Sequence, residues 1–394
     1  MRKRLFISVL TVALFAAPIG RAQTPPFWIG PIAPLTTFSP NNDGWLAPGE
    51  GGYAYLGTNN LERGLAYNPF TDHLYLVSRA NVGGDAANIR ILDKNTGADL
   101  GGLNKGSGIV SGGTFVVNTV RVGEDGAIYV ANLTTSQGAG LPFKVYRWAN
   151  ESATPTVAFN GTILSGARIG DSTDVIGSGS STLMVAGYGS SPSVGGNNGY
   201  AVIDLTAGTG THISFGTPPN PGDFRLGITF GSSSSHVLGA QSAGAGSPTT
   251  VRNTSYSGGT GTLINSIALS GSNLQVLMDY AVIAGIPFLA THSVGDSTVR
   301  IWDISDPNNP VLYARGNNTS GTLTSNGNGT GQMAWGDITY DSVTQTWSAK
   351  LWSLSSNQGI QAFVVTVPEP SSITLATLGG LALLALFGRR RISQ

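Results

Sequence analysis

A strand pattern that recurs six times is the feature that most constrains how this chain of 394 residues can fold. Each repeat opens with a short run of β-branched and aromatic residues, and a second such run begins eight or nine residues later. Runs of this kind, bounded by glycine and polar residues, predict β-strands. The first strands recur every 52 to 58 residues, at Gly64–Tyr67, Thr119–Val122, Asp174–Gly177, Gly227–Phe230, Asp279–Val282 and Asp337–Tyr340.

Every repeat except the fourth also has a clear third strand. The second strands are His73–Val77, Ala127–Ala131, Leu183–Ala186, His236–Ala240, Pro287–Ala290 and Thr346–Ala349, and the third are Ile89–Asp93, Lys144–Trp148, Tyr200–Asp204, Val299–Asp303 and Ile360–Val364. Three or four strands in a unit of about 40 to 55 residues are the signature of β-propeller blades, whose sheets bury their faces against their neighbours. The sequence predicts an all-β propeller of about six blades. A β-sandwich or β-solenoid is the alternative fold.

The segment Thr36–Leu56 lies outside the six repeats and contains the strand-like run Gly52–Leu56. We expect this run to close the ring by pairing with the last blade, or else to begin a seventh blade. Stretches rich in glycine, serine, threonine and asparagine cannot bury enough apolar area to order themselves. They are predicted loops, at Gly231–Ser235, Gly239–Thr250, Ser257–Thr262 and Asn317–Gly331.

Composition excludes several classes of function. The chain has no cysteine, so it has no disulfides, thiolate metal sites or cysteine nucleophile. Between residues 23 and 366 there are 14 basic and 20 acidic side chains, a net charge of −6. That balance argues against an extended phosphate-binding face, so we expect no nucleic-acid partner.

The N-terminus has the layout of a secretory signal. The basic residues Arg2, Lys3 and Arg4 precede an apolar stretch from Leu5 to about Ala17, and small residues lead to Ala22 and Gln23. We predict a signal helix, with residues 1–22 removed by signal peptidase between Ala22 and Gln23. A permanent N-terminal anchor is the alternative, although the apolar stretch is short for a span of about 20 residues.

The C-terminal segment 367–394 has three parts in order. Val367, Pro368, Glu369 and Pro370 come first, and an apolar run from 373 to 388 follows. That run is near the lower limit for a transmembrane helix. The cluster Arg389, Arg390 and Arg391 then holds the end of the helix on the cytoplasmic side, which leaves the 23–366 body outside.

This tail resembles the PEP-CTERM sorting signal of Gram-negative bacteria, because Pro368, Glu369 and Pro370 match its namesake tripeptide and the helix and arginine cluster follow in its order. The resemblance implies processing by an exosortase, a membrane transpeptidase-like enzyme paired with exopolysaccharide production. An ordinary tail anchor is the alternative. The body is also similar to uncharacterised propeller-like domains of other PEP-CTERM proteins, and Val299–Leu312 looks like the outer hairpin of bacterial propeller repeats with an Asp-Pro-x-x-Pro turn.

No catalytic, metal or cofactor motif is recognisable. The four histidines, His73, His212, His236 and His292, lack metal-ligand spacing, and His73 and His236 open second strands at equivalent places. Gly177–Gly179 is a degraded nucleophile elbow without the strand-to-helix context that an elbow needs. Oxygen-rich turns at Asn41–Gly44 and Asp303–Asn309 have too few carboxylates for a calcium loop.

Two groups of side chains are candidates for a site. Acidic residues begin or flank the first strands, which line the centre of a propeller, so they form either a ring of carboxylates near one mouth or separate solvent-facing residues: Asp171, Asp174, Asp279, Asp337 and Glu62. Aromatic residues crowd the last repeat, where they either stack on sugars or pack between blades: Trp335, Trp347, Trp352 and Tyr340.

The sequence therefore predicts an exported protein, held at the inner membrane by its C-terminal helix in transit and then placed on the cell surface or in the extracellular matrix. We expect a non-enzymatic binding propeller, with an exopolysaccharide or a surface protein as its partner. One alternative is a polysaccharide-acting enzyme, which would need two of the aspartates to converge in a pocket beside tryptophans. The other is a structural or adhesive matrix protein.

Overall fold

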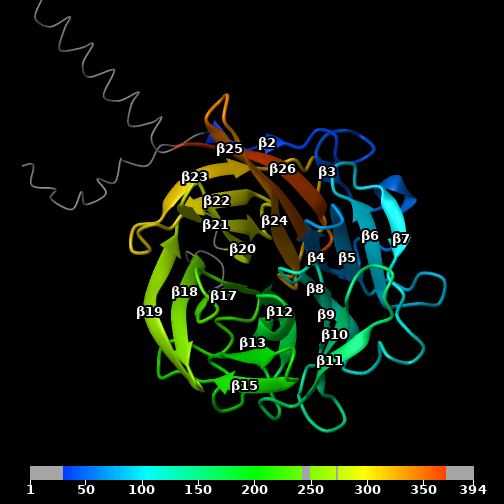
Figure 1. Ribbon diagram of the computed structural model, residues 1–394, viewed down its shortest axis with the longest axis vertical. Helices are drawn as coiled ribbons and strands as arrows, with labels where there is room; N and C mark the ends of the chain where they lie inside the picture. Colours follow the sequence, from blue (N-terminus) through cyan, green and yellow to red (C-terminus); the bar gives the residue numbers. More distant parts are fainter. Residues whose placement is uncertain (1–29, 242–248, 272–273, 370–394) are drawn as a thin grey trace, which may run out of the picture.

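The computed structural model describes residues 30–241, 249–271 and 274–369. In this part of the chain, six antiparallel sheets stand around a common axis as the blades of a β-propeller (Figure 1). The colours of Figure 1 pass around the ring in sequence order, so the blue N-terminal strands lie beside the orange and red C-terminal ones. The predicted signal helix, its cleavage site at Ala22 and Gln23, Pro370, the C-terminal helix and Arg389–Arg391 lie outside the described residues.

Blades 1 to 3 each have four strands in sequence order from the axis outwards. Blade 1 contains β4 (Glu62–Asn68), β5 (His73–Ser78), β6 (Asn88–Asp93) and β7 (Asp99–Gly102). Blade 2 contains β8 (Phe115–Val122), β9 (Ile128–Leu133), β10 (Phe143–Trp148) and β11 (Thr156–Gly161). Blade 3 contains β12 (Ile169–Ile176), β13 (Leu183–Tyr188), β14 (Tyr200–Asp204) and β15 (Thr209–Ile213), with a short 3₁₀ turn η2 (Gly179–Ser181).

Blades 4 and 5 follow the same plan, whereas blade 6 has three strands of its own and is completed by strands of the N-terminal segment. Blade 4 contains β16 (Gly227–Phe230), β17 (His236–Ala240), β18 (Thr249–Ser257) and β19 (Thr260–Leu269). Blade 5 contains β20 (Gln275–Ile283), β21 (Ile286–Ser293), β22 (Val299–Asp303) and β23 (Val311–Gly316), and blade 6 contains β24 (Gly331–Asp341), β25 (Thr346–Ser355) and β26 (Gly359–Pro368). The predicted outer hairpin within Val299–Leu312 is the β22–β23 pair.

The N-terminal segment closes the ring, as predicted, but by different residues. Strand β2 (Ala33–Pro34) and strand β3 (Trp45–Leu46) both pair antiparallel with β26, and β1 (Gly30–Pro31) pairs parallel with β23 of blade 5. The prediction that Gly52–Leu56 forms the closing strand is wrong. Three glycines with positive φ, Gly49, Gly51 and Gly52, precede or begin this run, and they favour a 3₁₀ turn there instead, η1 (Glu50–Gly52).

The fourth repeat has the third and fourth strands that the sequence pattern did not reveal. Strands β18 and β19 form a long antiparallel hairpin that includes residues predicted as loops at both of its ends. Its side chains are mostly threonine, serine and asparagine, and alternate residues of β18 are buried. A polar but alternating strand is therefore easily taken for a loop when apolar runs are the criterion.

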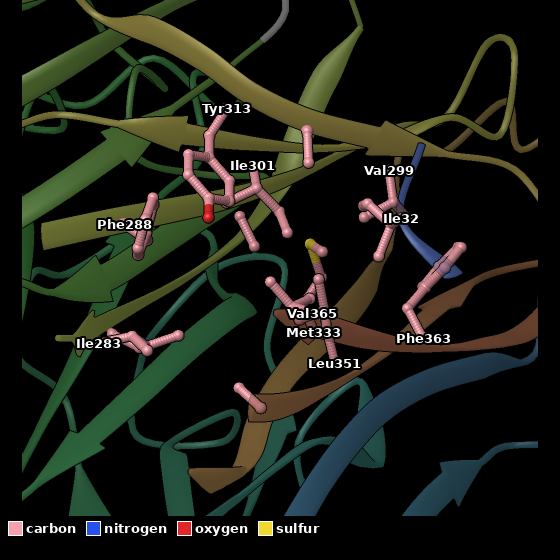
Figure 2. Close-up of a cluster of buried hydrophobic side chains, with 14 of the residues drawn as sticks. Ile32, Ile283, Phe288, Val299, Ile301, Tyr313, Met333, Leu351, Phe363 and Val365 are labelled. Carbon is pink, nitrogen blue, oxygen red and sulfur yellow. The ribbon is translucent and has the colours of Figure 1, made fainter. Parts of the chain in front are cut away.

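The hydrophobic core lies between adjacent blades. Figure 2 shows the cluster between blades 5 and 6, where Phe288 and Ile301 of one blade and Met333, Leu351 and Phe363 of the other are all fully buried. Ile32 of the N-terminal segment packs into the same cluster, so ring closure also buries apolar surface. Each such side chain stabilises the fold by about 1.5–3 kcal/mol relative to its exposed state.

Near the axis the inner strands approach too closely for side chains at some positions. A Cβ on Gly64 of β4 would lie 2.8 Å from the Val120 amide nitrogen and 2.9 Å from Gln332 Oε1. Glycine at this position therefore allows three blades to meet at the centre. Within the described residues, no helix is long and apolar enough to cross a membrane.

Candidate functional site

Two long polar side chains tie the inner strands together across the axis. Gln332 Oε1 accepts hydrogen bonds from the amides of Leu65 and Val120, at 3.2 and 3.0 Å. Arg121 donates from Nε to the Thr173 carbonyl at 2.9 Å and from Nη1 to the Met333 carbonyl at 2.7 Å. The centre of the propeller is thus filled by buried polar groups that join blades 1, 2, 3 and 6.

Arg121 also brings two of the predicted carboxylates together. Its Nε lies 3.3 Å from Asp174 Oδ1, and its Nη1 lies 3.6 Å from Asp279 Oδ1. Asp174 accepts from the Thr229 hydroxyl and the Phe230 amide, and Asp279 accepts from the Trp335 amide at 2.8 Å. Burial raises the pKa of Asp279 well above its usual range, and the negative charge of Asp174 adds to this effect. The positive charge of Arg121 acts in the opposite direction but does not cancel it.

The end of the axis at which the inner strands begin carries a cluster of arginines, which we call the arginine mouth. It comprises Arg63, Arg79, Arg168 and Arg225 with the carboxylates Glu62 and Asp171. Asp171 is 3% exposed and binds Arg168 at 2.5 Å and Arg225 at 3.1 Å. Glu62 accepts from the Gly57 amide at 2.6 Å and forms no ion pair with an arginine of the described residues. The arginine mouth therefore contains four basic side chains and two acidic ones.

Two arginines of this mouth are buried with donors unused. Arg63 donates to the Thr330 hydroxyl and to the Asn60 carbonyl, and Arg79 reaches the same carbonyl at 3.4 Å. Within the described residues, Arg63 Nε and Arg79 Nε and Nη1 have no hydrogen-bond partner. Burial, with Arg63 as a second cause, lowers the pKa of Arg79 to about 9. A buried guanidinium with free donors is the arrangement that an anion would stabilise.

A cavity of about 470 Å³ opens beside the arginine mouth. Arg225 lines one side of it, and the β23–β24 connection lines another through Asn326, Asn328 and Gly329, next to the Thr330 that Arg63 binds. Leu226, Val276 and Val294 add apolar wall. A mixed apolar and amide lining of this volume suits a sugar-sized ligand with a polar edge. A second cavity, of about 340 Å³, lies between the loops that include Asn198 and Pro219.

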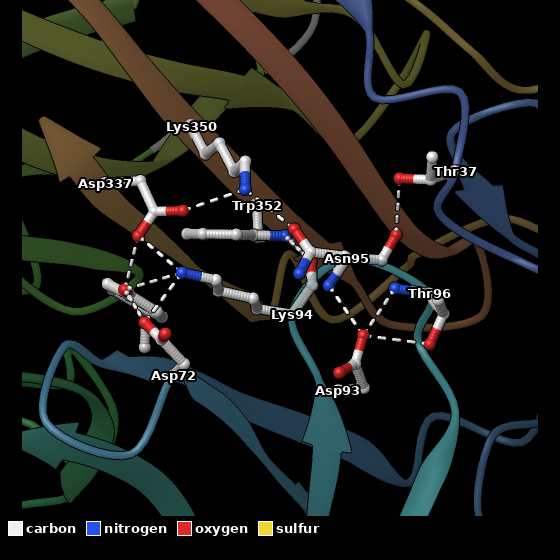
Figure 3. Close-up of polar contacts among 10 residues, drawn as sticks. Thr37, Asp72, Asp93, Lys94, Asn95, Thr96, Asp337, Lys350 and Trp352 are labelled. Atoms are coloured by element: carbon white, nitrogen blue, oxygen red, sulfur yellow. Dashed lines mark hydrogen bonds and ion pairs between the residues drawn. The ribbon is translucent and has the colours of Figure 1, made fainter. Parts of the chain in front are cut away.

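The fifth predicted carboxylate lies elsewhere. Figure 3 shows Asp337 between Lys94 of blade 1 and Lys350 of blade 6, at 2.8 Å from each ammonium nitrogen. The Tyr67 hydroxyl also donates to it. Although burial acts in the opposite direction, the hydrogen bonds from Lys350, Lys94 and Tyr67 lower the pKa of Asp337 to about 2. Asp337 therefore forms an ion-pair network that joins the first and last blades.

The predicted ring of carboxylates does not form. Asp171 and Glu62 lie at the arginine mouth, Asp174 and Asp279 lie around Arg121, and Asp337 lies between blades 6 and 1. Both versions of the expectation are wrong, because these carboxylates are largely buried and bonded instead of facing solvent separately. Asp171, Asp174 and Asp279 pair with arginines, and all of these pairs except the local one between Arg168 and Asp171 join residues about one repeat or more apart in the sequence.

The aromatic residues of the last repeat divide between packing and surface. Trp352 is fully buried, stacks on Tyr67 at 4.8 Å and donates to the Lys94 carbonyl, so it belongs to the closure between blades. Trp335 donates to the Asp279 carbonyl at 3.3 Å. Trp347 and Tyr340 lie 5.2 Å apart on the β24–β25 hairpin, where Tyr340 is 41% exposed.

The histidines and the oxygen-rich turns have local partners. His73 and His236 open β5 and β17, at equivalent places as expected, and bond Glu151 and Asn253. Asp43 accepts from the Trp45 amide and Asp303 from the Ser305 amide, as in turns without metal. Among the residues that the structure describes, no group of three or more His, Asp or Glu side chains is arranged to hold a metal ion.

Sequence reasoning missed the residues that dominate the centre. Arg121 and Gln332 lie in strands that also contain other polar residues, such as Asn118 in β8, so nothing in the sequence marked them out before these strands were known to be innermost. Arg168 and Arg225 lie just before the inner strands β12 and β16, so they occupy similar places in successive repeats. Comparison of equivalent places in successive repeats could therefore have identified these two arginines as neighbours.

Comparison with known proteins supports the tail and the fold. Residues 366–391 match the family model of the PEP-CTERM protein-sorting motif. The body resembles the crystal structure of a DUF4623 family protein from Bacteroides eggerthii, with a TM-score of 0.55 at 15% identity over 79% of this chain and 72% of that one. It also resembles the WD40 domain of Toxoplasma gondii coronin, with a TM-score of 0.45 at 8% identity over 78% and 69% of the two chains. No curated protein sequence matches this chain significantly.

Proposed function

We propose that this protein is exported, sorted through its PEP-CTERM tail, and uses its propeller to bind a carboxylate-bearing sugar of an exopolysaccharide at the arginine mouth, without cleaving it. The sorting-motif match implies export and membrane-anchored processing by an exosortase. The body has a net charge of −6, so an acidic ligand would be repelled from most of its surface. The arginine mouth is where four cations outnumber two anions.

One observation carries the choice of ligand. Arg79 is 9% exposed, and its Nε and Nη1 have no partner among the described residues. Leaving buried donors unsatisfied costs about 1–3 kcal/mol each. A carboxylate can accept two parallel hydrogen bonds from one guanidinium. The cavity of about 470 Å³, which is lined by Arg225 of the same arginine mouth, would hold the sugar ring that bears the carboxylate.

Asn328 offers a test that leaves the core intact, because it lines the cavity but its side chain is exposed. Short oligogalacturonates should bind the purified full chain, as measured by calorimetry, more tightly than neutral galactose oligomers of equal length. Asn328→Asp places a negative charge at the cavity and should weaken this binding about tenfold, whereas the matched neutral Asn328→Ser should change it little. Equal affinity for both oligomers, or equal effects of both substitutions, would overturn the proposed ligand.

The pair Asp174 and Asp279 supports a second candidate, a polysaccharide-cleaving enzyme. A carboxyl with a raised pKa beside a second carboxyl is the arrangement of an acid and base pair. Neither of the two cavities described above is lined by these residues. Release of reducing ends from acidic polysaccharide, abolished by Asp279→Asn, would establish the enzyme. Binding without release would favour the binding module.

A further inference from the structure

The sorting motif begins inside the folded propeller. Strand β26 pairs with β25 along its whole length, ending with Trp347 opposite Val367 and Thr346 opposite Pro368. The family match starts at residue 366. The first residues of the motif are therefore part of the sheet of blade 6, and its next residue, Glu369, is also held.

Val367 is held by burial. Its side chain is 1% exposed and belongs to the core cluster between blades 5 and 6, together with Val365 and Ala349. The neighbouring Thr366 carbonyl accepts a hydrogen bond from the Tyr313 hydroxyl of blade 5 at 3.0 Å. Detaching this residue from the propeller would expose apolar surface and break a contact between blades.

Glu369 is held by the tip of the β24–β25 hairpin. Its amide donates to the Gln345 carbonyl at 3.1 Å, and its Oε2 accepts from the Tyr340 hydroxyl at 2.8 Å. The ring of Tyr340 packs against Trp347 at 5.2 Å, which positions the hydroxyl. The two residues that bind Glu369, Tyr340 and Gln345, lie near the exposed end of the hairpin, where Val343 is 90% exposed.

We infer that the β24–β25 hairpin is an intramolecular docking site for Val367–Glu369. An exosortase would then act on the tail only after these three residues have been released from the propeller. An enzyme that reads an extended segment needs its main chain and side chains free. Here one edge of the strand, the Val367 side chain and the Glu369 carboxylate are all engaged. The inference deepens the proposed sorting and rests on it.

Tyr340→Phe removes only the hydroxyl that binds Glu369. Loss of one hydrogen bond at a partly exposed side chain should favour the released tail and increase the rate of tail processing about two- to tenfold. The measurement is a pulse-chase of full-length chain in a host with an exosortase, followed by the mass of the product. Tyr256→Phe is the matched control, because it removes a hydroxyl that binds Ser234 in blade 4, far along the chain from the tail.

A second variant tests the release without depending on that hydrogen bond. Ser348 and Thr366 lie opposite each other on β25 and β26, and the wild-type chain has no cysteine. Replacing both by cysteine should form a single disulfide that locks the strand, slows processing and restores it when a reductant is added. Unlocked single-cysteine variants serve as controls.

The outcomes separate this inference from the proposed sorting. A wild-type tail that the exosortase never processes would remove the sorting itself. A processed wild type whose rate is unchanged in Tyr340→Phe and in the disulfide variant would overturn the docking alone. Slower processing in Tyr340→Phe would also overturn it, because the hairpin would then present the motif instead of covering it.

Discussion

At the scale of single residues, Arg121 carries the largest share of the polar contacts at the centre. It is 6% exposed and joins two carbonyls and two carboxylates from three other blades. Buried charges of this kind are stable only while their partners are present. Burial raises the pKa of Asp279 in spite of the opposing attraction of Arg121, so loss of Arg121 would leave a charge on Asp279 with still less compensation.

We therefore predict that Arg121→Met lowers the free energy of unfolding by about 3–5 kcal/mol, because two carboxylates lose their shared cation. Asp279→Asn in the same chain should restore part of this loss, since the amide still accepts from the Trp335 amide but carries no charge. Urea unfolding of the two single variants and the double variant measures the coupling. Strictly additive losses would contradict the shared role of Arg121.

His292 should make stability depend on pH. It is fully enclosed at 1% exposure, bonded to the Ser353 hydroxyl at 2.6 Å, and burial lowers its pKa to about 3. In the unfolded chain histidine binds its proton near pH 6.5. Between these values the unfolded state holds more protons, so stability is complete above about pH 6.5 and falls with decreasing pH.

The expected slope from His292 is up to about 1.4 kcal/mol per pH unit between pH 6 and 4. Buried aspartates with lowered pKa values add to acid sensitivity, so the difference between wild type and His292→Gln isolates the histidine. Urea unfolding at pH 7, 6, 5 and 4 provides the comparison. Parallel stability curves for the two proteins would contradict a neutral buried His292.

At the scale of elements, the ring depends on a closure made by very short strands. Strand β3 is two residues long, yet Leu46 is fully buried in the core cluster that joins blades 6 and 1. Trp45 donates to the Gln358 carbonyl at 2.7 Å beside it. Packing, more than strand length, fixes the N-terminal segment to the last blade.

Leu46→Ala should cost about 2–5 kcal/mol of stability, because it leaves a cavity where the ring closes. Leu100→Ala on the outermost strand β7 is the control, since Leu100 is 51% exposed and should change stability by less than about 0.5 kcal/mol. Thermal and urea unfolding of both variants tests this. Equal costs would mean that the closure does not contribute specifically.

The sequence predicted elements better than their contacts. Apolar runs marked five third strands correctly because buried strands select β-branched and aromatic residues, as in β14 and β22. The strand β18 was not predicted because most of its residues are polar. The closing strands β2 and β3 were not predicted because two-residue strands have no detectable periodicity. The arginine mouth escaped as well, because a propeller brings together residues about one repeat apart, such as Asp171 and Arg225, that no local pattern connects.

At the scale of the whole molecule, the ring and the tail are continuous. The first and last blades are joined by Asp337 with Lys94, by Trp352 on Tyr67 and by β3 on β26. The same last blade then passes directly into the sorting motif through Pro368 and Glu369. A propeller that is not closed would leave β26, which leads into the motif, without its pairing to β2 and β3.

The most direct test of the central claim is the intact mass and location of the mature protein, made from the full-length gene in a host with its exosortase and in the same host without it. We predict loss of residues 1–22 in both hosts. Loss of the chain beyond about Pro370, with release to the surface or matrix, should occur only when the exosortase is present. A full-length tail held in the membrane of both hosts would contradict sorting and make the tail a plain anchor.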